Sequence, residues 1–192
     1  MKILTLIGFV LMSVPAIKAE DSFYVKAETG PAFTEDVHVH MHQPQNAFDL
    51  KTKTGVRVDL AGGYNFNKYL AGELNVAMVR TKLIDLGHTD YYQVPLMANV
   101  LGKYPIGKWQ PYAGVGFGSV VVIPDNHGQG ADDVNGVIGA QAMAGVQYRI
   151  ASNCSVEVGY KFLYADTIRP ANRIELGPSY THSFLAGLTY HF

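Results

Sequence analysis

Three histidines alternate with apolar residues between positions 37 and 42, and their spacing is suited to binding a metal ion. Residues two apart on an extended chain lie on the same face, with Cα atoms about 6.5–7 Å apart. Neighbouring imidazoles at that spacing can converge on one ion, and zinc or copper would suit them. Alternatively, imidazole is only the polar choice on one strand face, because no acidic or cysteine residue has a clear companion spacing. The candidate ligands are His38, His40 and His42.

Charged and amide side chains recur at every second position of several other segments, between positions that are apolar. Both signs of charge are present, so these groups can pair if the fold brings them together. Pairing is needed wherever they leave water, because an isolated buried charge costs on the order of several kcal/mol. The predicted polar network consists of Arg57, Asp59, Glu73, Asn75, Gln141, Arg149, Glu157 and Lys161.

The elements that position these groups are β-strands, because the alternation has a period of two rather than 3.6 residues. The same alternation also places Lys26, Glu28, Gln93 and Lys103 on the polar face. The glycines follow strand spacing, notably in the Gly114, Gly116, Gly118 line. Eight strands are predicted, over residues 22–33, 56–66, 70–78, 92–104, 109–123, 138–150, 156–164 and 183–192.

The connections between the strands alternate in length. Three are short, at residues 65–68, 105–108 and 151–153, and four are long, at residues 34–54, 81–90, 124–136 and 165–179. Long strands, an even strand count and this alternation are typical of an outer-membrane barrel. The predicted fold class is all-β: an eight-stranded antiparallel up-and-down transmembrane β-barrel. Its long loops face out of the cell, and its short turns face the periplasm.

Pro95 lies inside the fourth predicted strand, where a closed barrel has no free edge for a residue without an N–H donor. We expect a β-bulge at this position, or a strand that begins its pairing later.

Composition and the N-terminus limit the remaining classes. The 192 residues are 48% hydrophobic and 16% charged, with 15 Lys+Arg against 16 Asp+Glu, which excludes a disordered chain and gives no basic excess for nucleic acid. Cys154 is the single cysteine, so no internal disulfide forms. Residues 1–19 are typical of a cleaved signal peptide, with a positive start and an apolar run too short to span a bilayer. Residues 20–192 then form the barrel domain.

Four stretches carry a family resemblance: VPLMANV at residues 94–100, QPYAGVG at 110–116, AGVQYR at 144–149 and VGYKF at 158–162. They resemble the opacity-like, OmpA-like family of small bacterial outer-membrane barrels. The resemblance covers the whole chain after residue 19 and implies a bacterial outer-membrane location. In this family an ending like that at Phe192, with aromatic or apolar residues at alternate positions before it, is the signal read by the outer-membrane assembly machinery. The family mixes adhesins, small porin-like proteins and uncharacterised members.

Eight strands enclose an interior that is just wide enough for side chains to fill. We therefore expect a structural scaffold whose outer loops are displayed for binding or adhesion. Its expected partners are outer-membrane lipids, including lipopolysaccharide, and an extracellular ligand, but not nucleic acid. The alternative is a narrow porin-like channel, gated by Glu73 or Glu157 changing partners between Lys161 and Arg149.

A lipid A-modifying enzyme is the third hypothesis, because some eight-stranded barrels of this kind modify lipid A. His182, Ser183 and Glu175 offer the residue types of a deacylase. Adjacent strand residues point to opposite faces, however, so His182 and Ser183 cannot readily form a base–nucleophile pair. The sequence also contains no phosphate-binding glycine loop, nucleotide fingerprint or nucleophile elbow. We expect the protein not to be an enzyme and to carry no cofactor beyond a loop-bound zinc or copper ion.

Overall fold

The computed structural model describes residues 23–35, 37–41, 48–50, 54–82, 90–124, 135–167 and 174–192. The predicted signal peptide lies outside these residues. Within them, no helix is long and apolar enough to cross a membrane. The strands are β1 (Phe23–Thr34), β2 (Val37–Met41), β3 (Phe48–Leu50), β4 (Gly55–Asn67), β5 (Leu70–Lys82), β6 (Asp90–Lys103), β7 (Trp109–Pro124), β8 (Asn135–Arg149), β9 (Cys154–Ala165), β10 (Ile174–Leu176) and β11 (Ser179–His191).

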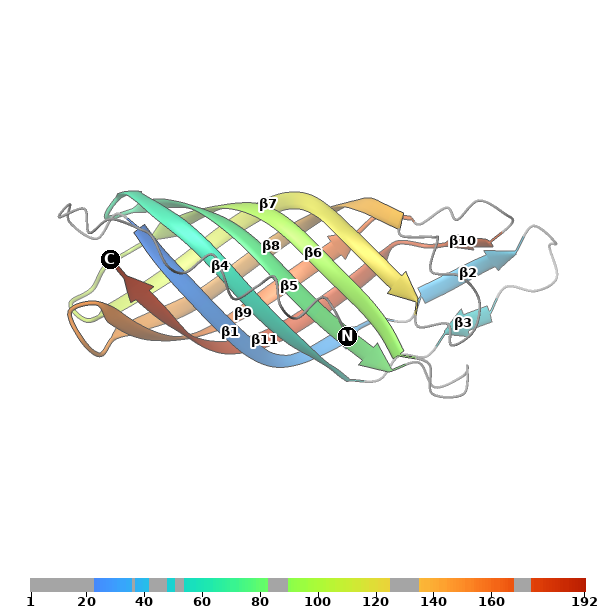
Figure 1. Ribbon diagram of the computed structural model, residues 1–192, viewed down its shortest axis with the longest axis horizontal. Helices are drawn as coiled ribbons and strands as arrows, with labels where there is room; N and C mark the ends of the chain where they lie inside the picture. Colours follow the sequence, from blue (N-terminus) through green and yellow to red (C-terminus); the bar gives the residue numbers. More distant parts are fainter. Residues whose placement is uncertain are drawn as a thin grey trace, which may run out of the picture.

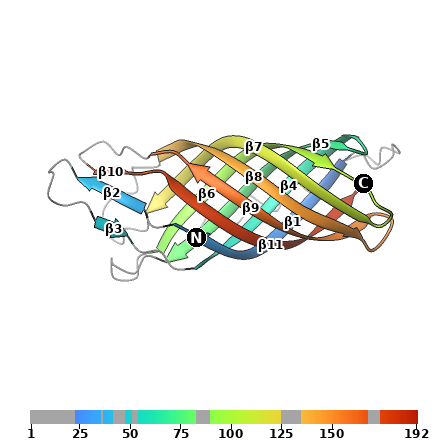
Figure 2. The ribbon, with the colours of Figure 1, turned by 180° about the vertical axis from the view of Figure 1, so that it is seen from behind.

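Eight of these strands form a closed barrel in the order β1-β11-β9-β8-β7-β6-β5-β4 (Figures 1 and 2). Each strand pairs antiparallel with both neighbours, and β1 closes the barrel by pairing with β11 on one side and β4 on the other. The backbone N–H of Phe192 donates to the carbonyl of Phe23 at 3.0 Å, which extends this closure to the C-terminus. The predicted eight-stranded antiparallel barrel is confirmed.

The alternation in the sequence corresponds to alternate exposure on the barrel exterior and burial in the lumen. In β4 the apolar Val56 and Val58 are 55% and 43% exposed, whereas the intervening Arg57 is fully buried and Asp59 is 1% exposed. The barrel strands thus present apolar residues to the surroundings, and most of the charged and amide side chains of the strands face the lumen. This is the reverse of a water-soluble protein and the arrangement that a bilayer requires.

Pro95 does not produce the bulge or the late start that the sequence led us to expect. β6 begins at Asp90, before the proline, and pairs with β7 without interruption from Tyr91 to Lys103. On the β5 side the ladder skips Val94 and Pro95 and resumes at Gln93 in the same register. The barrel therefore accommodates the missing donor as a local gap on one side of the strand, because pairing on the other side keeps the register.

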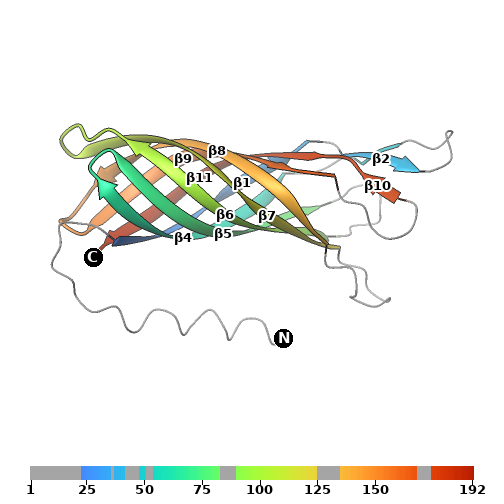
Figure 3. The same cartoon turned by 90° about the horizontal axis from the view of Figure 1, so that it is seen from above.

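A small second sheet lies beyond the barrel, at the end opposite the C-terminus (Figures 1 and 3). It has the order β10-β2-β3 and joins the connection after β1 to the connection after β9. The sequence predicts only long loops in these two places. Only the backbone of these three strands is described.

The short connections lie at the opposite end, beside the C-terminus. The Oδ1 atom of Asn67 accepts hydrogen bonds from the backbone N–H groups of Tyr69 and Leu70 at 2.7 and 2.9 Å, which closes the turn between β4 and β5. The turn between β6 and β7 uses Gly107 at a φ of 61°, a conformation that favours glycine. These tight turns fix the ends of β4 to β7 relative to one another.

Candidate functional site

The lumen holds two groups of buried ions, and the first lies around Lys161 on β9. Its ammonium Nζ is 2.6 Å from Oε2 of Glu28 and 2.6 Å from Oδ2 of Asp59. The other carboxylate oxygen of Asp59 accepts a hydrogen bond from Nε of Arg57 at 3.0 Å. These four residues, from β1, β4 and β9, are at most 3% exposed, and we call them the Lys161 cluster.

The second group lies around Lys26 on β1. Its Nζ is 2.9 Å from Oε2 of Glu73, but 3.6 Å from Oε2 of Glu28 and 3.9 Å from Oε1 of Glu157. The Tyr24 hydroxyl also donates to Oε2 of Glu73, at 3.2 Å. We call Lys26, Glu73 and Glu157 the Lys26 cluster. Glu28 approaches both lysines and so links the two clusters.

Aromatic rings surround the Lys26 cluster. The Lys26 ammonium lies 5.5 Å from the centre of the Tyr112 ring, and the Lys103 ammonium lies 4.3 Å from the centre of the Tyr24 ring. Lys103 also donates to Oδ1 of Asn65 at 2.9 Å. Ring faces stabilise cations that have lost water, so they complement the carboxylates here.

Amide side chains connect the ions into one network. Nε2 of Gln141 donates to Oδ1 of Asn99 at 2.6 Å, and Nδ2 of Asn99 donates to Oε1 of Glu73 at 3.4 Å. Oε1 of Gln141 accepts a bond from Nη2 of Arg57 at 3.3 Å, which reaches the Lys161 cluster. Gln147 donates to Oε2 of Glu157 at 2.9 Å. Such linked hydrogen bonds satisfy charges that could not otherwise leave water.

The buried charges balance. Within the part of the chain whose side chains the structure describes, eight charged residues are buried in the lumen, four cations and four anions: Lys26, Arg57, Lys103 and Lys161, with Glu28, Asp59, Glu73 and Glu157. The cations and anions of the lumen therefore compensate one another in number.

The lumen is filled toward the outer end as well. Met97, Val120, Leu163 and Ala165 form a buried apolar cluster from β6, β7 and β9. Nearby, the hydroxyl of Thr34 lies 3.0 Å from that of Thr181 and 3.4 Å from that of Thr81. Thr34 and Thr181 are register partners on the adjacent strands β1 and β11, and Thr81 is on β5, so these hydroxyls link one side of the barrel wall.

Seven of the eight residues in the predicted network lie buried in the lumen. Asn75, for example, is 1% exposed and donates to the carbonyl of Leu60 at 3.2 Å. The exception is Arg149, which is exposed at the last position of β8, beside Lys108 in the neighbouring turn. The alternation predicts that Arg149 lies on the lumen face of its strand, but the residue is at the end of the barrel, where its side chain reaches solvent.

The gated-pore hypothesis assumes that Glu73 or Glu157 changes partners between Lys161 and Arg149, but the ion pairs in the structure are different. Lys161 bonds to Glu28 and Asp59, not to Glu73 or Glu157, while Glu73 bonds to Lys26. The predicted network omits Lys26 and Glu28, although the alternation places both on the polar face. It also omits Tyr24. The feature of the sequence that could have identified Tyr24 is an aromatic residue on the polar face of the first strand.

The predicted metal ligands fall on the small outer sheet. His38 and His40 are in β2, opposite Asp49 of β3 and Glu175 of β10 respectively, in the backbone register. His42 lies outside the described residues. Among the residues whose side chains the structure describes, no group of three or more His, Cys, Asp or Glu residues is arranged to hold a metal ion.

His182 and Ser183 lie on opposite faces of β11, as adjacent strand residues should. Ser183 is fully buried in the lumen, whereas His182 faces outward. Nδ1 of His182 is 2.6 Å from the Tyr160 hydroxyl, and its Nε2 is 3.1 Å from Oε1 of Glu35. The outward histidine therefore has a phenol and a carboxylate as partners, not Ser183.

Comparison with known proteins agrees with this architecture. Residues 4–192 match the family described as outer membrane protein beta-barrel domain. No curated protein sequence matches the chain. Among solved structures, Neisserial surface protein A (NspA) is similar, with a TM-score of 0.65 and 19% identity over 88% of this chain and 97% of that one.

Two further structures have the same fold. OprG from Pseudomonas aeruginosa has a TM-score of 0.56 and 13% identity, covering 92% of this chain and 99% of its own. Ail from Yersinia pestis has a TM-score of 0.50 and 14% identity, covering 89% and 99%. The family match extends over nearly the whole chain, and the closed barrel has the polar lumen and apolar exterior of a membrane protein. The chain therefore belongs to the family of outer membrane protein β-barrel domains, whose place is the bacterial outer membrane.

Proposed function

We propose that the protein is a structural scaffold that displays its outer segments for binding or adhesion. The observation that carries this proposal is the filled lumen. Among the described residues, four buried cations and four buried anions neutralise one another, and a buried apolar cluster occupies the lumen nearer its outer end. A barrel filled in this way is a rigid support rather than a conduit.

The outer sheet supports the binding half of the proposal. β2, β3 and β10 extend the molecule beyond the barrel, and they join segments that are far apart in the sequence (Figure 1). Among the structural neighbours, Ail is named an attachment invasion locus protein, and its structure was solved with the heparin analogue sucrose octasulfate. A displayed surface on a small barrel is therefore a reasonable place for an extracellular ligand.

Conductance measurements test the scaffold against the narrow porin-like channel. The folded protein is reconstituted in planar bilayers, with a large porin inserted in the same way as the positive control. We expect no stable unitary conductance, because the ion network and the apolar cluster occupy the lumen. Stable unitary steps would favour the channel, and variants of Met97 and Leu163 would then show whether the apolar cluster limits the current.

Binding assays test the display function. One variant replaces residues 37–50, which contain β2 and β3, with a short Gly-Ser linker, and the control shortens the connection between β7 and β8 instead. A heparin-coated surface and cultured host cells are the first probes. We expect binding to be lost in the first variant and kept in the control. Equal binding by cells with and without the protein would contradict the display function.

One observation favours the hypothesis of a lipid A-modifying enzyme, and it concerns the outward-facing His182. Its imidazole lies between the Tyr160 hydroxyl and the Glu35 carboxylate, so it could move a proton at the outer rim. Mass spectrometry of lipid A from cells expressing the wild type or His182→Ala tests this. We expect identical lipid A. A modified acyl or headgroup pattern that needs His182 would establish an enzyme instead.

The metal hypothesis stays a prediction of the sequence, now with an acidic residue opposite two of the histidines in the register. Isothermal titration with zinc, comparing the wild type with a variant in which His38, His40 and His42 are alanine, tests it. Equal heats from both proteins would remove the idea.

We propose that export and assembly follow the rules of the family. Residues 1–19 direct secretion and are removed, and Phe192 presents the C-terminal signal to the assembly machinery. Phe192 is 48% exposed at the end of the barrel, next to β1. N-terminal sequencing of the purified protein should begin at residue 20, and Phe192→Ala should lower the amount of folded protein in the outer membrane.

A further inference from the structure

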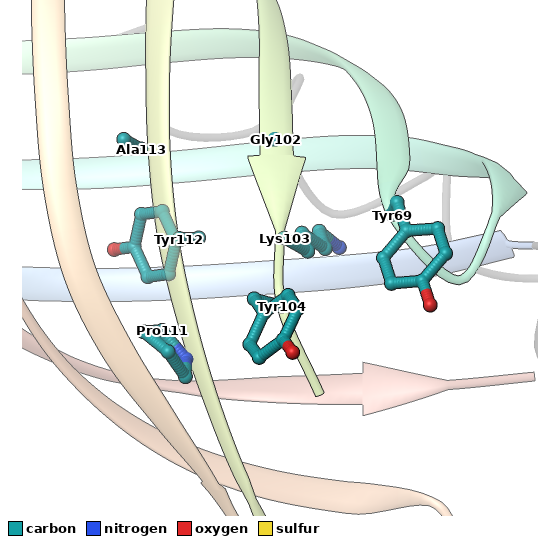
Figure 4. A pocket seen from close by; sticks show the side chains of 7 residues that line it. All are labelled: Tyr69, Gly102, Lys103, Tyr104, Pro111, Tyr112 and Ala113. Atoms are coloured by element: carbon teal, nitrogen blue, oxygen red, sulfur yellow. The ribbon is translucent and has the colours of Figure 1, made fainter. Parts of the chain in front are cut away.

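A hollow lies on the exterior of the barrel at its periplasmic end, between the ends of β6 and β7 (Figure 4). Its volume is about 350 Å³, and it is a shallow depression that is open to the surroundings rather than an enclosed pocket. We call it the β6–β7 notch. Its outward-facing lining consists of Tyr69, Gly102, Tyr104, Pro111 and Ala113, while Lys103 and Tyr112 lie between them on the strands with their side chains buried on the lumen side.

The floor of the notch is made of small residues. Gly102 and Ala113 face each other in the register of β6 and β7, and both are exposed on the outward face. At one side the rings of Tyr69 and Tyr104 stack, with centroids 6.3 Å apart and planes 22° apart. A groove with a floor of small residues and phenolic walls at the membrane interface suits a molecule that is apolar along its length and polar at its end.

The turns around the notch are positively charged. The Lys68 ammonium lies 4.9 Å from the centre of the Tyr69 ring, and Lys108 is exposed in the turn between β6 and β7. The short turns, residues 65–69, 104–108 and 150–153, contain these two lysines and no Asp or Glu. The third nearby lysine, Lys103, is directed into the lumen and bonds to Asn65. The exposed charge at the notch is therefore cationic.

We propose that the β6–β7 notch binds one anionic glycerophospholipid of the periplasmic leaflet. Its acyl chain lies over Gly102 and Ala113, beside the stacked tyrosines, and its phosphate-containing headgroup lies at the level of Lys68 and Lys108. The notch opens on the apolar face of the barrel at interface depth, so a lipid reaches it by diffusion in the leaflet. The cationic turns favour an anionic headgroup over a zwitterionic one.

A tryptophan placed in the notch reports on this site. Trp109, the single tryptophan, packs on Tyr148 of β8 with ring centroids 4.6 Å apart, on the side of β7 away from β6, so it is replaced by phenylalanine. Tyr104→Trp in that background puts the reporter in the wall of the notch. The full chain is folded into phosphatidylcholine vesicles that contain a small mole fraction of brominated phosphatidylglycerol or brominated phosphatidylcholine. Bromine quenches tryptophan on contact, so quenching measures the occupancy of the notch by each lipid.

We expect brominated phosphatidylglycerol to quench this reporter more than brominated phosphatidylcholine at the same mole fraction. Lys68→Gln and Lys108→Gln should each reduce this preference by about fivefold, since each removes one cation near an anionic lipid. Raising the salt concentration should reduce it as well.

A second pair of variants tests the floor of the notch. Gly102→Leu fills it without forcing the backbone, because an added Cβ would meet only the Ala113 carbonyl oxygen, at 3.8 Å. The matched control is Gly62→Leu, at an outward glycine of β4 where an added Cβ meets nothing within 4 Å. We expect Gly102→Leu to abolish the preference and Gly62→Leu to preserve it, with both proteins showing the heat-dependent gel mobility of a folded barrel.

Each result decides the proposal. Equal quenching by the two brominated lipids overturns it. A preference that survives Gly102→Leu also overturns it, because the lipid would then be held by the charged rim without entering the notch. A preference lost equally in the Gly102 and Gly62 variants indicates a general effect on the barrel surface and counts against a site. Only loss confined to Gly102→Leu and the lysine variants supports the notch.

Discussion

The two ion clusters of the lumen both pair a lysine with carboxylates, but they differ in how closely the charged atoms approach one another. The Lys161 cluster places one ammonium 2.6 Å from each of two carboxylates, with Arg57 as a second cation on Asp59. The Lys26 cluster has one contact of 2.9 Å and two longer ones, and it is supported by phenols. The first concentrates its stabilisation in one side chain, and the second distributes it over many.

This difference shows how a barrel can fill its lumen with charge in two ways. A compact cluster is rigid, because removing its central cation leaves two buried carboxylates short of a partner. A distributed cluster tolerates the loss of one contact, because tyrosine and amide donors remain on the same carboxylate. If any part of the lumen rearranges, it is the Lys26 side.

Lys161→Met should have the largest effect of the changes considered. It removes the shortest contacts of both Glu28 and Asp59, and breaking a buried ion pair costs about 3–5 kcal/mol. Urea unfolding in detergent micelles, followed by the fluorescence of Trp109, measures this loss. The control is Lys68→Met at an exposed position, where we expect less than about 0.5 kcal/mol. A similar loss in the two variants would contradict the assignment of Lys161 as the centre of the network.

Lys26→Met should cost less, about 1–3 kcal/mol. Glu73 loses its ammonium but keeps hydrogen bonds from the Tyr24 hydroxyl and from Nδ2 of Asn99. The same unfolding experiment ranks the two lysines directly. A loss equal to or greater than that of Lys161→Met would show that the distances do not report the relative strengths of the clusters.

The alternation predicted which face each residue occupies, but not its height along the barrel axis. Arg57 and Asp59 lie in the lumen as predicted, because a period of two fixes the face. Arg149 is on the predicted face too, but at the rim, because height depends on where the strand ends. The pairing of Lys161 with Glu28, which lies far away in the sequence, depends on the stagger between strands, and no local pattern encodes it.

The small outer sheet and Pro95 show the same limit. β2, β3 and β10 pair across connections that the sequence marks only as long, so their partners could not be identified beforehand. At Pro95 the expected bulge is absent, because the long ladder with β7 holds the register through the gap on the β5 side. The local preference of a proline for a bulge is overridden where many neighbouring residue pairs keep the same register.

Gly63→Ala should destabilise the Lys26 side through packing rather than charge. An added Cβ would overlap the ring of Tyr24, which is 2% exposed and cannot move away freely. Overpacking of this kind costs about 1–3 kcal/mol. The adjacent Gly62 faces outward with open space, so Gly62→Ala is a matched control with an expected change near zero. Equal unfolding midpoints for the two variants would show that Tyr24 adapts to the methyl group, and that the aromatic wall is softer than we infer.

Measured in the Lys161→Met background, Glu28→Gln gives the smallest of these effects, and comparison with the Lys26→Met background makes it the most discriminating, because Glu28 contacts both lysines at different distances. In the Lys161→Met background it removes a carboxylate that has lost its 2.6 Å partner, so it should restore about 1–2 kcal/mol of stability. In the Lys26→Met background the lost contact was 3.6 Å and the bond to Lys161 remains, so the same change should restore nothing and instead remove a good ion pair. Unfolding of the two double variants therefore gives effects of opposite sign. Rescue in both backgrounds would mean that Glu28 is shared equally, and that the lumen holds one cluster rather than two.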